Sequence, residues 1–195
     1  MKEAAILPVA LLGLLSDSEA FGQVINVGAH TLLPDTPGQT IEIRVSGGAA
    51  VQAVDFNVQI ADGFPTGGTV DGPNITGVDI IGTALNPTIF FGNANAPTTL
   101  RQDPQMWSLF TTTQSGTVVA NGLLGILTVD TTGWFSGNWT LALGNTQEGA
   151  TDFTSFIPAT ITDGSITVVP EPVSSAVVAT LLLAGAVFLR RRRNG

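Results

Sequence analysis

The sequence predicts an all-β protein: a single antiparallel β-sandwich of about nine or ten strands, jelly-roll or immunoglobulin-like in arrangement. Short runs of alternating apolar and polar residues have the period of half-buried strands. Turn sequences such as DTPG, DGPN and TDG separate these runs. An apolar segment stands at each end, so three regions are expected: a signal helix over 1–22, the sandwich over 23–169 and a C-terminal segment over 170–195.

The N-terminal region has the pattern of a signal peptide. A mostly apolar run from Ala4 to Leu15 has about the length of a signal-peptide core and is too short to span a bilayer. Ser18 and Ala20 are small residues, and they place cleavage between Ala20 and Phe21, with cleavage after Gly22 as the alternative. A buried apolar segment of the domain is the competing interpretation.

The region between the two ends reads as a succession of short strands. Apolar side chains alternate with polar ones over Ile41–Val45 and again over Val54–Ile60, which predicts strands with one face in the core and one in water. Further candidate strands are 23–28, 77–81, 88–91, 106–111, 122–130, 139–143 and 165–169. About 147 residues are a reasonable size for one sandwich.

Three stretches of this region resemble a known family. They are PGQTIEIRVSGGAAVQAVDFNVQIADG, GLLGILTVDTTG, and TDF followed later by DGSITV. Their spacing resembles cohesin-like, carbohydrate-binding-type sandwiches, in which a central G-x-L-x-x-L-x-V strand follows an early strand pair and the last strand begins after Asp-Gly. The resemblance implies a cohesin-like β-sandwich. The segment from Phe64 to Pro104 departs most from the pattern, and variable loops are expected there.

The C-terminal region is predicted to cross a membrane once. The run Val173–Leu189 holds 17 residues without a charge, and as a helix it spans roughly 25 Å. The positive-inside rule places the following cluster, Arg190, Arg191, Arg192 and Arg193, in a cytoplasmic tail over 190–195. The residues before Pro170 then lie outside the cytoplasm. A buried core helix is the alternative, but such a helix would not normally end in four arginines.

The order of motif, helix and basic cluster is similar to a known sorting signal. Val169, Pro170, Glu171 and Pro172 precede the apolar run, and the arginines follow it. This resembles the PEP-CTERM signal of exported bacterial proteins. The resemblance implies handling by an exosortase-type processing enzyme, in a bacterium with exopolysaccharide or biofilm machinery. On this resemblance Pro170, Glu171 and Pro172 are recognition residues of a substrate, not catalytic residues.

Charge and residue usage exclude several classes of site. Between Gln23 and Val169 there are 11 acidic and 2 basic residues, a net charge of −9, which disfavours nucleic acid as a partner. The chain has no cysteine, and His30 is its single histidine, expected to be solvated. No catalytic site, no metal site and no cofactor is therefore predicted. A glycan hydrolase would need two facing carboxylates, which no spacing in the chain indicates.

Acidic and aromatic residues leave two binding hypotheses open. Several aspartates sit in or near turns without EF-hand spacing and are interpreted as solvated, so calcium binding stays undecided: Asp62, Asp71, Asp79, Asp152 and Asp163. Trp107 and Trp139 share strand faces with leucines and are expected in the core. Trp134 follows a turn and could stack on a sugar ring from a loop tip.

These features predict an exported, non-enzymatic protein of the cell surface or extracellular matrix. The precursor is expected to be anchored in the inner membrane by its C-terminal helix and to be a substrate of the exosortase-type enzyme. The body would then be a structural or adhesive part of a biofilm or exopolysaccharide envelope. The alternative is a module that binds carbohydrate or another surface protein through a sheet face, and a glycan hydrolase ranks third.

Overall fold

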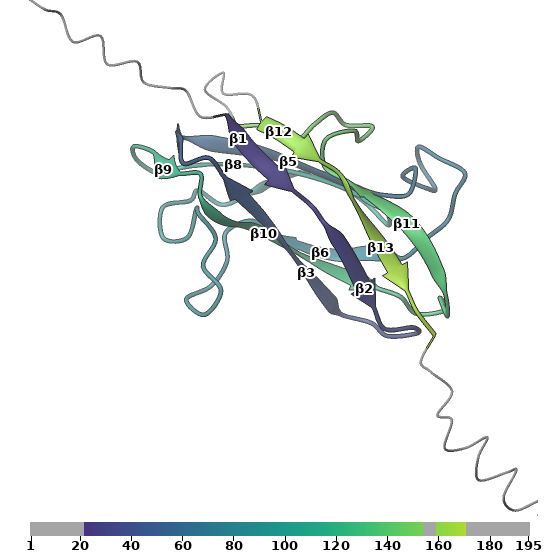
Figure 1. Cartoon of the computed structure of the whole chain (residues 1–195). Helices are drawn as coiled ribbons and strands as arrows, with labels where there is room; N and C mark the ends of the chain where they lie inside the picture. The colour runs from purple at the N-terminus through teal and green to yellow at the C-terminus, as the bar shows by residue number, and fades with distance from the viewer. Residues whose placement is uncertain (1–21, 154–158, 171–195) are drawn as a thin grey trace, which may run out of the picture.

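The computed structural model describes residues 22–153 and 159–170, and these form two β-sheets packed face to face (Figure 1). The described residues contain strands, turns and loops but no helix, which confirms the all-β prediction. In this part of the chain no helix has the length and apolar character to cross a membrane. The predicted signal peptide with its cleavage site at Ala20 and Phe21, the apolar run over 173–189 and the arginine cluster lie outside the described residues.

Two main sheets and one small sheet make up the described body. The five-stranded sheet has the order β12 (Ala159–Thr162), β1 (Gln23–Asn26), β3 (Gln39–Ser46), β10 (Gly122–Asp130) and β6 (Asn74–Asp79). The six-stranded sheet has the order β2 (Ala29–Leu32), β13 (Gly164–Val168), β11 (Gly137–Ala142), β5 (Ala53–Ile60), β8 (Met106–Thr112) and β7 (Thr98–Asp103). A short pair, β4 (Ala50–Val51) and β9 (Val118–Val119), stands apart from both.

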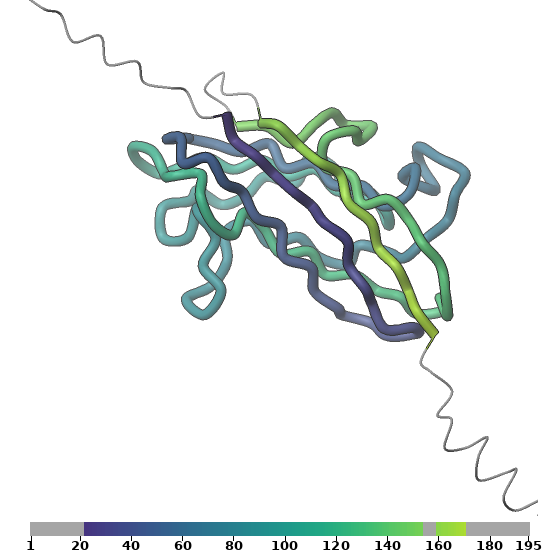
Figure 2. The backbone as a smooth tube through the Cα atoms, in the orientation of Figure 1, coloured from purple at the N-terminus to yellow at the C-terminus, as the bar shows by residue number. Residues whose placement is uncertain are grey.

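The sandwich is not purely antiparallel as predicted, because its first and last segments run parallel. Strand β1 pairs with β12, and β2 pairs with β13, both in parallel. The ladder continues through the bend between the sheets, since Val27 N donates to Thr162 O and Ser165 N to Gly28 O, each at 3.0 Å. The two segments therefore run side by side across both sheets and close one edge of the sandwich (Figure 2).

The core lies between the two main sheets. On β3, Ile41, Ile43 and Val45 are buried while the residues between them are exposed, which confirms one wet face. On β5 the same prediction is wrong, because Asn57 and Gln59 are also buried, with exposed fractions of 2% and 5%. Alternation identifies which face of a strand meets the core, but it does not show what covers the other face.

Two of the predictions between residues 64 and 104 need correction. The candidate strand 88–91 is a turn, in which the Thr88 hydroxyl donates to the carbonyl oxygens of Ile80 and Ile81, and Phe90 fills the core. A stretch of four residues with three apolar side chains is too short to separate a strand from a core-filling turn. The region is also more than loops: besides β6, which overlaps the predicted strand 77–81, it contains β7, and each of the two lies at an edge of one main sheet. Strand β7 escaped prediction because its sequence TTLRQD is polar and mostly exposed.

Candidate functional site

The outer face of the six-stranded sheet is divided into an exposed half and a covered half. The exposed half lies on β2, β13 and β11, whose outward side chains are small and polar: Thr31, Asn138, Thr140, Ser165 and Thr167. The covered half lies on β5 and β8, where the outward residues Asn57, Gln59, Met106 and Ser108 are buried. The loop of residues 144–150, here called the flap, lies over this covered half.

The flap begins and ends at fixed points of the backbone. Leu143 N and Gly144 N donate to Asp163 Oδ1 at 2.8 and 2.7 Å, which holds the start of the flap against the bend between β12 and β13. Thr151 N donates to Leu143 O at 2.7 Å, so the two ends of the flap are joined directly. The Thr151 hydroxyl then bonds both the N–H and the carbonyl of Asn57, and the chain continues along β5.

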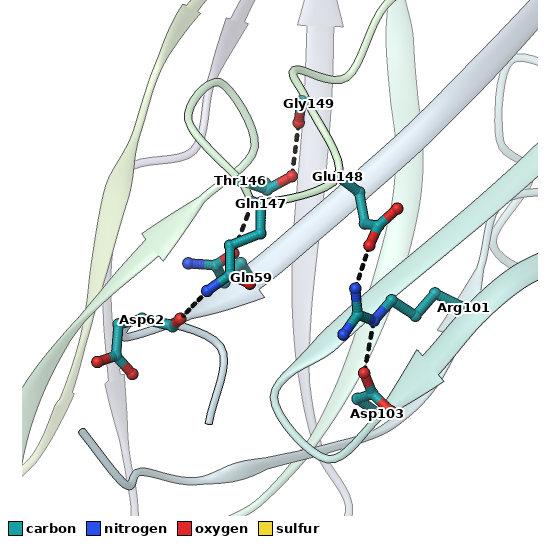
Figure 3. Close-up of polar contacts among 8 residues, drawn as sticks. All are labelled: Gln59, Asp62, Arg101, Asp103, Thr146, Gln147, Glu148 and Gly149. Atoms are coloured by element: carbon teal, nitrogen blue, oxygen red, sulfur yellow. Dashed lines mark hydrogen bonds and ion pairs between the residues drawn. The ribbon is translucent and has the colours of Figure 1, made fainter. Parts of the chain in front are cut away.

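Gln147 fastens the tip of the flap to β5 (Figure 3). Its backbone N–H donates to Gln59 Oε1 at 2.9 Å, and its side-chain Nε2 donates to the carbonyl oxygen of Asp62 at 2.6 Å. The first of these bonds satisfies the oxygen of the buried Gln59 amide, and Gln59 Nε2 donates to Ala61 O at 3.3 Å, so the amide keeps partners away from water. The flap therefore supplies hydrogen bonds to the Gln59 end of the covered half.

Glu148 fastens the flap to the far strand of the sheet (Figure 3). The Arg101 guanidinium on β7 pairs with Glu148 and, at 2.5 Å, with Asp103. These carboxylates raise the pKa of Arg101, and the hydrogen bond from Arg101 lowers the pKa of Asp103. Because Gln59 lies on β5 and Arg101 on β7, the flap spans β8 between them. The flap was not predicted from the sequence. An ion pair at Arg101 could have been expected, because residues 23–169 contain only two basic residues among many carboxylates.

A shallow pocket adjoins the exposed half of the sheet. It has a volume of about 280 Å³, and its lining includes Asp62, Val70, Asn138, Trp139 and Thr140. Val70 is 52% exposed beside it. The pocket can take one side chain of a docked molecule, and the exposed half around it offers hydroxyl and amide groups.

The surface of the described residues is strongly anionic, because their two arginines are already paired with carboxylates. Among residues 22–153 and 159–170 the arginines are Arg44 and Arg101, and both are ion-paired, Arg44 with Glu42 at 2.8 Å. No arginine of the described residues is left to neutralise the remaining carboxylates. Their negative potential therefore attracts molecules with a basic surface.

The sorting residues are described only in part. Val169 is 48% exposed, and Pro170 is exposed beyond the end of β13. Glu171, Pro172 and the arginines over 190–193 lie outside the described residues. Figure 1 shows that β13 ends at the end of the sandwich opposite the start of β1, and Val169 and Pro170 follow outside the strands of both main sheets.

The tryptophans do not form an exposed strip for stacking on sugar. Trp107 and Trp139 are 9% and 8% exposed, which confirms that they belong to the core. Trp134 packs edge-on against Trp139 with ring centroids 5.0 Å apart, and it is partly buried. The loop tip instead exposes Phe135, at 64%.

The polar residues singled out from the sequence mainly make hydrogen bonds to nearby backbone groups. His30 is partly buried, with Nε2 2.7 Å from Val27 O, and is therefore not simply solvated. The Asp62 carboxylate accepts N–H bonds from Thr69 and Val70, and these bonds lower its pKa. In the described part of the chain no group of three or more His, Asp or Glu side chains is placed to hold a metal ion.

Comparison with known proteins identifies the class of fold. No protein-family model matches the chain, and no curated protein matches it. Among solved structures, the sixth cohesin from scaffoldin B of Acetivibrio cellulolyticus, in complex with a Cel5 dockerin mutant, superposes with a TM-score of 0.53 at 11% identity, over 75% of this chain and 99% of that chain.

Two further structures agree. A non-cellulosomal cohesin from the archaeon Archaeoglobus fulgidus gives a TM-score of 0.51 at 9% identity, over 80% of this chain and 96% of that chain. The CaDoc0917–CaCohA2 complex gives 0.51 at 13% identity, over 75% and 99%. The described body is thus a β-sandwich of the cohesin type, as the sequence resemblance implied.

Proposed function

We propose that this protein is an exported, non-enzymatic module of the cell surface that binds another protein through the outer face of its six-stranded sheet. The observation that carries the proposal is the cohesin-type sandwich, whose structural neighbours include a cohesin in complex with a dockerin. A protein partner is favoured over a sugar because Trp107 and Trp139 are buried and Trp134 packs against Trp139, whereas the exposed half of the sheet is broad and polar.

The exposed half and the adjoining pocket form the docking surface of this proposal. The strands β2, β13 and β11 hold their side chains in fixed positions, so a partner would meet a rigid surface with little ordering cost. Hydroxyl and amide groups supply hydrogen bonds, and the pocket beside Trp139 takes an anchoring side chain. The anionic body attracts a partner with a basic surface.

Export and sorting complete the proposal. The signal-peptide pattern, the Pro-Glu-Pro segment, the apolar run and the arginines support a precursor that is anchored in the inner membrane and presented to an exosortase-type enzyme. The exposure of Val169 and Pro170 supports this proposal, because a protease-like enzyme needs an extended segment that is free of the sheet. The mature protein would then reach the cell surface or the extracellular medium.

A second candidate function is a structural or adhesive part of an exopolysaccharide matrix. It is favoured by the resemblance of residues 169–193 to a sorting signal of bacteria that produce such matrices. It differs from the first candidate in requiring no specific partner protein.

The binding surface can be tested with matched pairs of arginine substitutions. Thr31→Arg with Thr140→Arg places two long cations on the exposed half, and Thr40→Arg with Thr160→Arg does the same on the five-stranded sheet. The first pair is expected to weaken capture of a surface protein from the producing cells by about tenfold or more, through clash and like-charge repulsion. The second pair should bind as the parent does. Equal loss from both pairs, or from neither, would reject the exposed half as the docking surface.

Sorting can be tested by the mass of the protein recovered from its native cells. The expected mature form lacks about 20 N-terminal residues and everything beyond the Pro-Glu-Pro segment. Glu171→Ala should still be exported but should keep its C-terminal helix, because the processing enzyme loses its recognition residue. An intact C-terminus in the parent protein, or normal processing of Glu171→Ala, would contradict the sorting proposal without affecting the binding proposal.

A further inference from the structure

Two aspartates stand directly opposite each other beside the flap. Asp55 on β5 and Asp152 after the flap form an antiparallel bridge, in which each backbone N–H donates to the other's carbonyl oxygen at 3.0 Å. In such a pair the side chains share one face, and the Cα atoms are about 5.5 Å apart. Like charges at directly opposite positions repel each other and destabilise a sheet.

The chain supplies no cation for this pair within its described residues. Arg44 lies on the other sheet and pairs with Glu42, while Arg101 is taken by Asp103 and Glu148. Burial raises the pKa of Asp55, the charges of Asp152 and Glu148 raise it further, and the Asn57 side chain partly opposes them. A raised pKa in the folded state favours folding at low pH, and that contribution is lost as the pH rises through the folded-state pKa. The fold therefore disfavours the charged form of Asp55.

A buried amide oxygen lies next to this pair. Asn57 follows Asp55 by two residues on the same face of β5 and is 2% exposed. Its Nδ2 lies 3.4 Å from Ala150 O, but its Oδ1 and Asp55 Oδ1 are both buried and accept no hydrogen bond from any described residue. Asp55 Oδ1 and Asn57 Oδ1 are thus two buried acceptor oxygens on one face of β5, and a bound cation would satisfy both.

We propose that Asp55, Asn57 and Asp152 form a binding site for a hard divalent cation, calcium in preference to magnesium. Carboxylate and amide oxygens are the ligands that calcium takes in proteins, and water completes its six to eight positions. Magnesium requires a nearly ideal octahedron, which two opposed side chains and one neighbour do not provide. The cation neutralises the opposed carboxylates and joins the segment after the flap to β5, whatever molecule the sheet face binds.

The site has few protein ligands, so its affinity is low. Two carboxylates and one amide place the dissociation constant at about 10⁻⁴–10⁻³ M, the range of extracellular calcium modules. Such a site is filled outside the cell and weakly filled in the cytoplasm. Binding to the folded chain alone lowers the unfolding equilibrium constant by about tenfold when calcium stands at about ten times its dissociation constant.

The test is thermal unfolding of the full chain in detergent, with calcium chloride, with magnesium chloride, and with sodium chloride at matched ionic strength. Calcium should raise the unfolding midpoint more than magnesium does, and a chelator should reverse the rise. Asp152→Asn should abolish the rise. In the absence of metal the same variant should unfold at a higher temperature than the parent, because the repulsion is gone. A merely structural role of Asp152 would predict the opposite shift.

Glu42→Gln is the matched control, since it removes one carboxylate from the exposed face of the other sheet. It should respond to calcium as the parent does. The proposal is overturned if calcium leaves the parent unchanged, or if Asp152→Asn keeps the full calcium response. It is also overturned if only acidification stabilises the parent relative to Asp152→Asn, because the pair would then share a proton instead of binding a cation.

Discussion

Phe56→Asp is expected to leave no folded protein. Phe56 lies at the middle of β5, has no exposed surface and faces Leu109 on β8 across the ladder. Its ring reaches the opposite sheet, since a Cβ added at Gly125 on β10 would lie 3.4 Å from Phe56 Cε2. The substitution removes this contact and places an unpaired carboxylate in the core. The expected loss of stability is about 4 kcal/mol or more, a large share of what a domain has.

Circular dichroism and tryptophan fluorescence of the full chain should show a cooperative urea transition for the parent and none for Phe56→Asp. Phe135→Asp is the matched control, because the same change is made at a side chain that is 64% exposed. It should unfold like the parent, within about 0.5 kcal/mol. A soluble Phe56→Asp protein with the parent spectrum would mean that β5 faces the core with the other set of its side chains.

Strand β5 shows what sequence alone can predict about this fold. The period of two across Val54–Ile60 identifies Phe56 as a core residue, because no other arrangement buries all the apolar side chains of the run. The same pattern assigns Asn57 and Gln59 to water, and the structure buries both. Their cover comes from residues about 90 positions later in the chain, such as Gln147 and Thr151. No local pattern contains that long-range contact.

The candidate site was therefore less predictable than the core. Short polar side chains on β13 and β11 follow from alternation in the predicted strands 139–143 and 165–169, but β2 was not among the predicted strands, so only part of the exposed half could be outlined from the sequence. The flap could not, because NTQEGA has the composition of any turn. Asp55 and Asp152 could not be paired either, since each reads separately as a solvated carboxylate. Their opposition depends on strand pairing between distant segments.

The parallel pairing that closes the sandwich could not be predicted from the sequence either. Two glycines lie where it crosses from one sheet to the other. Strands β1 and β2 are one segment bent between the sheets, and β12 and β13 are another. The two bends touch at Gly28 and Gly164. In the sequence, the Asp-Gly before β13 resembles an ordinary turn. Its role is close packing of backbone on backbone, which depends on a segment more than 100 residues away.

Gly164→Ala is accordingly expected to destabilise the sandwich by about 3–5 kcal/mol. An added Cβ would lie well inside van der Waals contact of Gly28 O, and it would also be 2.9 Å from Val27 Cγ1. The first of these atoms belongs to the backbone and cannot move aside as a side-chain end could. The bend must open, and the bond from Ser165 N to Gly28 O is lost with it. Urea unfolding of the full chain should show a lower midpoint with an unchanged slope.

Gly77→Ala provides the matched control within a strand. Gly77 lies on β6, and an added Cβ there would meet only the Thr128 side chain, at 3.3 Å. This variant should be neutral or slightly more stable than the parent, by up to about 1 kcal/mol, because alanine restricts the unfolded chain. If Gly164→Ala also unfolds like the parent, then the two bends do not pack backbone on backbone. The parallel closure would then be loose enough for the first and last segments to separate without unfolding the sheets.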